Sequence, residues 1–362
     1  MPLPPDSATA SFRAETLARF CAELLGAVGT PAAHARLVAD SLVAANLRGV
    51  DSHGIQMLAM YLQQIRAGGL NPAASGRVIS ENGVCLHYDG ANGLGQVVAD
   101  QCTTHSVRLA RALGVSVVVA RHSNHFGAGA WWGEKLARAG FIGIVMSNAC
   151  PAVAPWQGTT PILGTNPLCV AVPGCGGEAR WMLDMATTTV ALGKLTHAGH
   201  LNQPTIPRAW GFLDAQGQPT TETAKAQAGA PTPTGGYKGS ALAMMVEILC
   251  AGLSGGAMTT ELPVYRTGGD PLGISHTFIA IDPARFLPAG EFEARVNRLV
   301  GMVKVAKPAP GFDEVLVAGE PEWRAEKVRR REGIPVPRSL WEKLGALAAE
   351  LKIEAPAPDA GR

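Results

Sequence analysis

The chain has 362 residues, of which 47% are hydrophobic and 17% are charged. Because a single core usually stops growing at roughly 250 to 300 residues, we expect two lobes. Its 31 basic and 29 acidic residues give a formal net charge of +2, which offers no electrostatic footprint for a nucleic-acid partner. No apolar run reaches the roughly 18 residues of a membrane span and the start lacks the pattern of a signal peptide, so we expect a cytoplasmic protein with no membrane partner.

The first 70 residues predict helices. Apolar side chains recur at helical spacing over residues 12–28 and stop at Gly29, which is typical of a helix end. Thr30-Pro31 then provides the start of a second helix, which extends to residue 45. A third helix is predicted over residues 57–65.

From residue 84 onward, short β-branched runs alternate with helical patterns, which indicates an α/β region. Residues 196–234 are rich in Pro, Gly, Thr and Gln and predict a long loop. We therefore expect an α/β domain over residues 81–289 and a largely helical lobe made of residues 1–80 and 290–362. The expected strands are 84–89, 115–120, 141–146, 168–172, 180–184 and 275–282, and the expected helices are 97–113, 127–138, 237–253, 291–305, 321–331 and 339–351.

The cysteines indicate neither a disulfide framework nor a metal site. None belongs to a C-x-x-C pair, and most lie in apolar stretches, where a reduced cysteine behaves as a small buried hydrophobe. The chain also has no H-E-x-x-H motif. The seven cysteines are Cys21, Cys85, Cys102, Cys150, Cys169, Cys175 and Cys250.

The segment RGVDSHG, residues 48–54, gathers two charged groups, a hydroxyl and an imidazole between two helices. Histidine is the side chain best matched to proton transfer near neutral pH, so His53 is a candidate proton donor to a carbonyl that receives a hydride, with Ser52 as a relay. In the alternative interpretation, Asp51 and Ser52 cap the helix that begins near Gly54, and His53 packs at its start. The residues alone favour neither.

Residues 115–140 combine a strand, a polar loop with His122 and His125, and a helix that opens with Gly127 and Gly129. A strand, glycines and a helix N-terminus can hold a pyrophosphate through free N–H groups. The glycine spacing does not match the Rossmann pattern, however, and no acidic residue follows at the required distance. The loop remains a candidate site for a phosphate or a reacting carbonyl.

Three further positions are candidates for polar roles. Thr165 lies in the turn Gly164-Thr165-Asn166-Pro167 and can supply a donor, or it can serve the turn alone. Asp184 ends a strand and is either a helix cap or a carboxylate directed toward a histidine. Lys238 lies beside a helix N-terminus, where the helix dipole disfavours a cation, which favours a bound anion over a merely solvated lysine.

Taken in order, five motifs resemble the malate/L-lactate dehydrogenase family that lacks a Rossmann fold: AANLRGVDSHG, HSNHFGAGAWW, LGTNPL, LDMATTTVALGK and GGYKGSALAMMVEIL. This family includes ureidoglycolate, sulfolactate and diketogulonate dehydrogenases and Δ1-piperideine-2-carboxylate reductase. The resemblance covers residues 12–352. It implies a two-lobed α/β subunit with a non-Rossmann NAD(P)-binding α/β domain, a helical second lobe on the substrate and dimer side, and assembly as a homodimer.

The resemblance also implies roles for individual residues. In the piperideine-carboxylate reductase, the residues that match Ser52, His53 and Asp184 act as relay, proton donor and relay. In ureidoglycolate dehydrogenase, the histidine that matches His125 accepts the proton. Contacts with the cofactor, NAD or NADP, would fall on His125, Phe126, Gly127, Ala128, Gly129, Asp184, Met185, Ala186, Lys238, Gly319 and Glu320.

One position departs from the family pattern. Members that bind a substrate carboxylate typically have an arginine four residues after the histidine of S-H-G, and this chain has Met57 there. A thioether cannot replace the two charge-assisted hydrogen bonds of a guanidinium. Another base such as Arg48 would then take over, or the recognised end of the substrate is not a carboxylate. Tyr61 fits the pattern, so the candidate substrate contacts are Arg48, His53, Met57, Tyr61 and Thr165.

The sequence thus predicts an NAD(P)-dependent oxidoreductase that transfers a hydride between the nicotinamide and a small 2-oxo or 2-hydroxy acid, or a related carbonyl or imine. The alternative is a catalytically altered member that binds a metabolite without turnover, and Met57 motivates it. A metal-dependent hydrolase built on His53, His122 and His125 is a third hypothesis, which the absence of closely spaced metal ligands disfavours.

Overall fold

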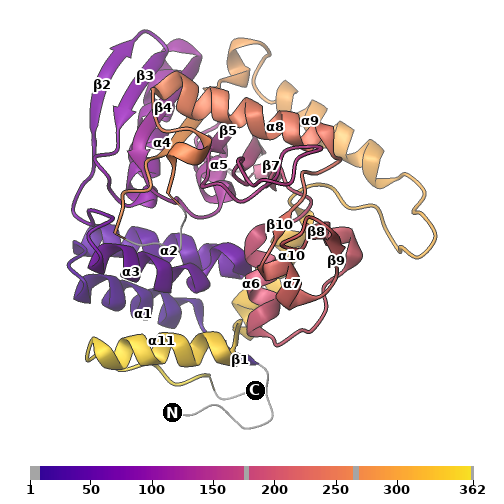
Figure 1. Ribbon diagram of the computed structural model, residues 1–362. Coiled ribbons are helices and arrows are strands. Elements are labelled where there is room, and N and C mark those ends of the chain that lie inside the picture. The colour runs from indigo at the N-terminus through magenta and orange to yellow at the C-terminus, as the bar shows by residue number, and fades with distance from the viewer. Residues whose placement is uncertain (1–8, 175–178, 264–268, 360–362) are drawn as a thin grey trace.

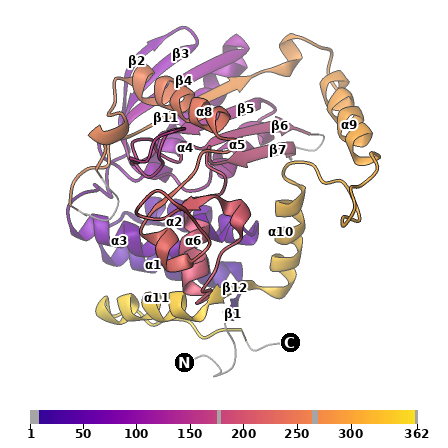
Figure 2. The same cartoon turned by 45° about the vertical axis from the view of Figure 1, so that its right-hand side comes forward.

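The computed structural model describes residues 9–174, 179–263 and 269–359. It is a mixed α/β structure in which a sheet covered by helices lies above a group of helices (Figures 1 and 2). The fold class expected from the sequence is confirmed. Cys175 lies outside the described residues, and the other six cysteines are free thiols, of which only Cys85 is exposed. In the described part of the chain, no helix combines the length and the apolar character that crossing a membrane requires.

The lower part of the molecule is helical, as the spacing of apolar residues predicts. Its core joins the two ends of the chain, because side chains as far apart as Phe12, Leu42 and Trp341 belong to one buried cluster. A short antiparallel pair of strands, β1 and β12, closes this part. The elements are β1 (Thr9–Phe12), α1 (Ala14–Ala27), α2 (Ala32–Leu47), α3 (Leu58–Arg66), β12 (Ile334–Pro337) and α11 (Arg338–Glu350).

The upper part is built on a seven-stranded sheet of order β2-β3-β4-β11-β5-β6-β7. Only β3 and β4 run parallel, and the other neighbouring strands are antiparallel. This topology explains why the glycine loop does not match a Rossmann pattern, which belongs to a parallel sheet. The strands are β2 (Arg77–Asn82), β3 (Cys85–Asp89), β4 (Val115–Ser123), β5 (Ile142–Ser147), β6 (Leu168–Pro173), β7 (Ala179–Met185) and β11 (Ile274–Ile281).

Helices cover both faces of this sheet. Phe278 and Ala280 of β11 belong to the buried cluster with α4 (Gly95–Leu113) and α5 (Gly129–Arg138), whereas Ile279 packs toward the side of α8 (Tyr237–Glu247). This alternation follows from the two-residue period of a strand. A π-helix, Ile248–Gly252, continues α8. The helix expected over residues 237–253 is therefore present, first as an α-helix and then as a π-helix.

The segment expected as one long loop, residues 196–234, contains short regular elements instead. They surround a small apolar cluster of their own that includes Leu195, Ile206 and Phe212. Two-residue strands are too short to show a hydrophobic period, which is why the sequence did not reveal them. The elements of this unit are α6 (Leu192–His200), β8 (Phe212–Leu213), β9 (Pro219–Thr220), α7 (Thr223–Gln227) and β10 (Ala230–Pro231).

The C-terminal segment links the two parts. Helix α9 (Glu291–Lys304), which the sequence assigned to the helical lobe, lies beside the edge of the sheet, where Asn297 accepts a hydrogen bond from Arg180 of β7 (Figure 2). Helix α10 (Glu320–Glu332) then runs from the sheet edge down to the helical part, where it contacts α2. After residue 304 the chain therefore passes from the sheet back to the helical part.

Candidate active site

The segment Asp51-Ser52-His53 forms a 3-10 turn, η1 (Asp51–His53), directly after α2, and η2 (Ile55–Met57) follows it. Asn46 fixes this turn from two directions. Its Nδ2 donates to Asp51 Oδ1 at 2.6 Å, and its Oδ1 accepts from the N–H of Ile55 at 2.8 Å. A Cβ on Gly54 would lie 2.2 Å from Asn46 Oδ1, so the turn can close only because residue 54 has no side chain.

Asp51 is held in an ion pair with the far end of the chain. Arg329 of α10 donates from Nη1 to Asp51 Oδ1 at 2.6 Å and from Nη2 to Oδ2 at 2.9 Å, and it also donates to the carbonyl oxygen of Asn46. Both charged side chains are less than one-fifth exposed. Such a bidentate pair fixes direction as well as distance, so Asp51 serves the shape of the turn and does not cap a helix.

The two candidate histidines meet although 72 residues separate them in the sequence. The rings of His53 and His125 are stacked, with their centroids 5.6 Å apart. Ser52 Oγ lies 2.9 Å from His53 Nδ1, and the Tyr61 hydroxyl lies 2.7 Å from His125 Nδ1. Gln96 Nε2 donates to that hydroxyl at 2.9 Å. The structure therefore brings together Ser52 and His53 of η1, Tyr61 of α3 and His125 of the loop before α5.

Both imidazoles are partly accessible but crowded by protein. Burial lowers the pKa of His53 to about 4. Burial, followed by the positive charges that His53 and His276 would carry, lowers the pKa of His125 to about 3. Desolvation disfavours the charged form of a histidine, so both rings are neutral at pH 7.

Asp184 holds the start of a helix. It stands in β7, and its Oδ2 accepts a hydrogen bond from the N–H of Ala130 at 2.8 Å, in the first turn of α5. A Cβ on Gly129 would lie 2.9 Å from Asp184 Oδ1. The side chain remains accessible to solvent, yet the surrounding protein raises its pKa to about 6, against this hydrogen bond and the nearby Arg48. Asp184 is thus not the N-cap of α6, the helix that follows it in the sequence, but its carboxylate accepts a hydrogen bond at the start of α5.

The three other candidate substrate contacts already have partners within the protein. Arg48 is buried and donates to Glu134 at 2.9 Å and to the sulfur of Met182 at 3.2 Å. Met57 is partly buried against the helical core. The carbonyl oxygen of Thr165 accepts hydrogen bonds from both the N–H and the hydroxyl of Thr187. A carboxylate would therefore compete with Glu134 for Arg48.

The candidate cofactor contacts form two groups. His125, Phe126 and the residues up to Gly129 line the loop before α5, and Phe126 stacks on His276 with ring centroids 4.6 Å apart. Met185 and Ala186 follow at the end of β7. Lys238 is exposed in the first turn of α8, after Gly235 and Gly236, which both have positive φ values of 59° and 63°.

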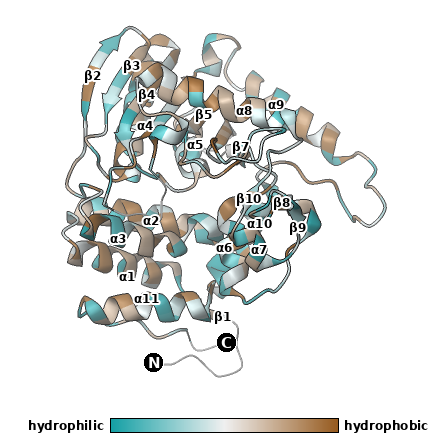
Figure 3. Ribbon diagram, viewed as in Figure 1, coloured by the Kyte–Doolittle hydropathy of each residue, from teal (hydrophilic) through white to brown (hydrophobic). Residues whose placement is uncertain are grey.

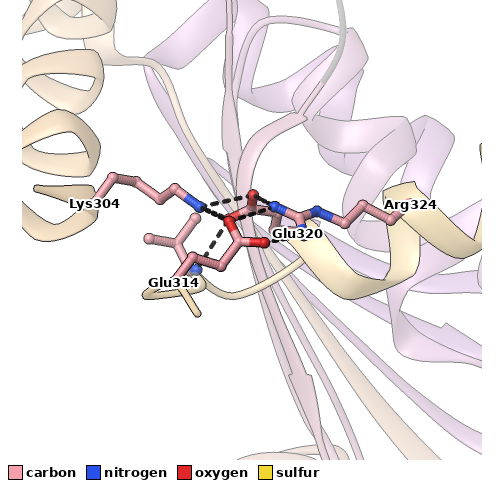
Figure 4. A network of polar contacts seen from close by, with 5 residues as sticks. Lys304, Glu314, Glu320 and Arg324 are labelled. Carbon is pink, nitrogen blue, oxygen red and sulfur yellow. Dashed lines mark hydrogen bonds and ion pairs between the residues drawn. The ribbon is translucent and has the colours of Figure 1, made fainter. Parts of the chain in front are cut away.

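Glu320 takes part in a charged network at the start of α10 (Figure 4). Lys304 Nζ donates to its two carboxylate oxygens at 2.8 and 2.9 Å, and Arg324 pairs with both Glu320 and Glu314. These cations lower the pKa of Glu320. Gly319, with φ +91°, turns the chain into α10 beside Met182. The network ties the segment before α10 to the end of α9.

Several residues of the site carried no signal in the sequence. Asn46, Gln96, His276 and Arg329 belong to ordinary helical or strand patterns, and their partners are remote in the chain. His276 is fully buried, with Ser147 and Ser123 hydroxyls 2.9 and 2.8 Å from its two ring nitrogens. Only a three-dimensional arrangement identifies such residues.

Comparisons with known proteins agree on one group. The family model described as malate/L-lactate dehydrogenase matches residues 12–345. The malate dehydrogenase of Pyrococcus horikoshii is 35% identical over 348 residues, which cover 94% of this chain and 95% of that protein. Its solved structure has a TM-score of 0.88 and covers 97% of this chain and 98% of that chain.

Two further relatives act on sulfonated acids according to their names. The L-sulfolactate dehydrogenase of Methanocaldococcus jannaschii is 35% identical over 91% of this chain and 94% of that protein, and a solved structure has a TM-score of 0.85, covering 96% of this chain and 98% of that chain. The (2R)-3-sulfolactate dehydrogenase (NADP(+)) of Chromohalobacter salexigens is 37% identical over 75% of this chain and 80% of that protein.

Proposed function

The chain belongs to the malate/L-lactate dehydrogenase family, and from this membership we propose that it is an NAD(P)-dependent dehydrogenase of small 2-hydroxy acids, or a reductase of the corresponding 2-oxo acids. The observation that carries the proposal is the meeting of Ser52, His53, Tyr61 and His125 where the helical part joins the sheet. When bound, the nicotinamide would accept or supply the hydride.

The protein itself supplies the proton chemistry. A neutral imidazole is ready to accept the hydroxyl proton of a 2-hydroxy acid, and the same group returns the proton in the reductive direction. His53, whose Nδ1 lies beside Ser52, and His125 are both neutral at pH 7 because burial lowers their pKa values. The ion pair of Asp51 with Arg329 keeps the turn that carries His53 in place.

The residues present fit a dinucleotide. The glycine turn before α8 places the exposed Lys238 at the N-terminus of the helix, where a phosphate gains from the helix dipole. The N-terminus of α5, by contrast, already holds the carboxylate of Asp184. We therefore assign residues 125–129 to contact with the uncharged nicotinamide end and Lys238 to the phosphates.

The test is turnover by the purified protein with NADH or NADPH. The panel contains 2-oxo acids whose far end is a methyl group, a carboxylate or a sulfonate, together with a cyclic imine acid, and the readout is the absorbance of the reduced nicotinamide. His53→Gln and His125→Gln should each lower kcat by about 10²-fold or more. Cofactor binding without turnover on any substrate would support the metabolite-binding alternative instead, and absence of both would refute the dehydrogenase.

We also propose that the functional unit is a homodimer. Most of α8 and its continuation has hydrophobic residues (Figure 3), and four of their large apolar side chains are exposed. Tyr237, Met244, Ile248 and Leu253, which we call the apolar stripe, are each more than half exposed. Contiguous apolar surface of this kind is typical of a protein interface. The expected cytoplasmic location stays a prediction.

A further inference from the structure

Gln96 is the second residue of α4 and is fully buried, although its side-chain amide has a polar oxygen and a polar nitrogen. The loop of His125 crosses directly over the start of this helix. A Cβ on Gly95 would lie 2.2 Å from the carbonyl oxygen of Asn124 and 2.4 Å from that of His125, so the loop can approach only because residue 95 is glycine. This approach places Gln96, Tyr61 and His125 in one row.

The direction of the hydrogen bonds in this row follows from the chemistry of each group. The Gln96 amide nitrogen, 2.9 Å from the Tyr61 hydroxyl oxygen, has hydrogens and no lone pair to offer, so it donates. The Tyr61 hydroxyl lies 2.7 Å from His125 Nδ1, and it donates its single hydrogen to that nitrogen because Nδ1 also accepts from the N–H of Gly127. Nδ1 therefore accepts.

A second donor reaches the same nitrogen independently of the two side chains. The backbone N–H of Gly127 donates to His125 Nδ1 at 3.4 Å, and a backbone N–H can never accept. Two donors thus converge on Nδ1, and a neutral imidazole carries only one hydrogen. That hydrogen must then be on Nε2.

We propose that Gln96 is a positioning residue of the active site, which acts through Tyr61 to hold His125 in the tautomer with its hydrogen on Nε2. This inference rests on the proposed dehydrogenase function for its catalytic meaning, but the tautomer can be observed without turnover. It divides the work between the two histidines. His125 donates a hydrogen bond from Nε2 to the substrate oxygen and keeps its own proton.

The proton that leaves or joins the substrate is then exchanged by His53. In oxidation, the hydroxyl proton of the substrate moves to the free ring nitrogen of His53 while the C–H hydrogen leaves as a hydride to NAD(P). Ser52 Oγ, 2.9 Å from His53 Nδ1, is a hydroxyl that can donate or accept, so His53 can hold either tautomer and change its protonation state. His125 lacks this freedom because both donors at Nδ1 are fixed.

The direct test is the ¹⁵N spectrum of the histidine side chains in the intact protein at pH 7, without substrate, with His125 assigned by comparison with His125→Gln. We expect the Nδ1 resonance of His125 in the range of a nitrogen without hydrogen and the Nε2 resonance in the range of an N–H. The opposite assignment overturns the proposal, whatever the activity of the protein.

The matched variants are Gln96→Glu and Ser106→Ala. A glutamate carboxylate accepts from the Tyr61 hydroxyl, which turns the oxygen lone pair of Tyr61 toward Nδ1. The Tyr61 contact, at 2.7 Å, is much shorter than the contact of the Gly127 N–H, at 3.4 Å, so it decides the tautomer and the ring hydrogen of His125 moves to Nδ1. Ser106 is also fully buried on α4, about 15 Å further along the helix. Its replacement should leave the tautomer and kcat unchanged.

Gln96→Glu should lower kcat by about 10²-fold, with a much smaller change in KM, because an oriented donor to the reacting oxygen is lost. Unchanged kcat together with a switched tautomer would refute the catalytic role of Gln96. Turnover by the unaltered protein with hydrogen on Nδ1 would refute the positioning while leaving the dehydrogenase intact. The expected tautomer without any turnover would refute the dehydrogenase and leave the Gln96 contact standing as a structural one.

Discussion

At the scale of single residues, the site depends on side chains that carry no chemistry themselves. Asn46 and Arg329 fix Asp51, and Gln96 directs Tyr61. The geometry of the histidine pair therefore depends on residues that lie behind the side chains proposed to react, as is common where a functional site must be rigid.

The buried histidines make stability depend on pH. Burial lowers the pKa of His276 to about 3, and His53 and His125 shift in the same direction. The unfolded chain binds protons below about pH 6.5 while the folded chain does not, so stability falls as the pH drops through that value. Asp184, whose pKa is raised to about 6, opposes this between about pH 4 and 6.

We expect the free energy of unfolding to be lower at pH 5 than at pH 7, by about 2 kcal/mol from His276 alone. Urea unfolding at the two pH values measures this difference. In His276→Gln the titrating group is absent, and the difference between pH 5 and pH 7 should shrink. A protein that is equally stable or more stable at pH 5 would contradict the assignment of His276 as a neutral buried group.

How much of the site could be predicted depends on where the partners of each residue lie. Ser52, His53 and His125 stand in compact polar motifs that are unusual for helix ends or turns, so the sequence pointed to them. Arg329 lies in a run of charged residues on α10, where nothing distinguishes it from its neighbours. Its role follows from a contact across 278 positions of the chain, which no local pattern encodes.

At the scale of elements, helix α6 packs directly on the turn η1. Gln56 connects them, because its Nε2 donates to the carbonyl oxygens of Ser52 and Gly193 at 3.1 and 3.3 Å. Gly193 stands in the first turn of α6, where a Cβ would lie 2.7 Å from the Cβ of Ser52. The unit that begins with α6 therefore supports the proposed active site as well as its own small core.

Gly193→Ala should push α6 away from η1. We expect a loss of about 1 to 3 kcal/mol of stability, which is typical of overpacking, and a fall in kcat because Ser52 moves. Gly345→Ala is the matched control, since Gly345 lies inside α11 with no atom within 4 Å of an added Cβ.

The control should stabilise the protein by about 0.5 to 1 kcal/mol, as expected when alanine replaces glycine inside a helix. Chemical unfolding and the initial rate of turnover are measured on both variants. If Gly193→Ala were as stable and as active as the original chain, the contact between α6 and the catalytic turn would have no functional weight.

The long helices and central strands were predictable because each has a clear period of apolar residues. The order of the strands was not. Strand β11 inserts between β4 and β5 although more than 120 residues separate it from either in the sequence. Nothing within the eight residues of β11 specifies its neighbours, because pairing is chosen by the assembled sheet. The family resemblance, by contrast, used motifs from the whole chain and is confirmed.

At the scale of the whole molecule, the apolar stripe on α8 leads to a prediction about assembly. Ile248 is 60% exposed and lies in the middle of this stripe. Ile248→Glu should place a charge in the proposed interface and shift the protein from dimer to monomer at micromolar concentration, as measured by light scattering. Leu113→Glu, at a 50% exposed position on α4 on the opposite face of the sheet, should leave the mass unchanged. A monomeric original chain would refute the homodimer.

The ion pair between Asp51 and Arg329 can form only late in the translation of the chain. The two residues are 278 positions apart, which corresponds to about 15 to 55 seconds of translation at typical rates of 5 to 20 residues per second. Throughout that interval the emerging chain already carries Ser52 and His53, but the residue that fixes their turn does not yet exist. Strand β1 is likewise synthesised long before β12, the strand with which it pairs. A chain released before residue 329 therefore lacks the ion pair that holds Asp51, and we expect it to be inactive.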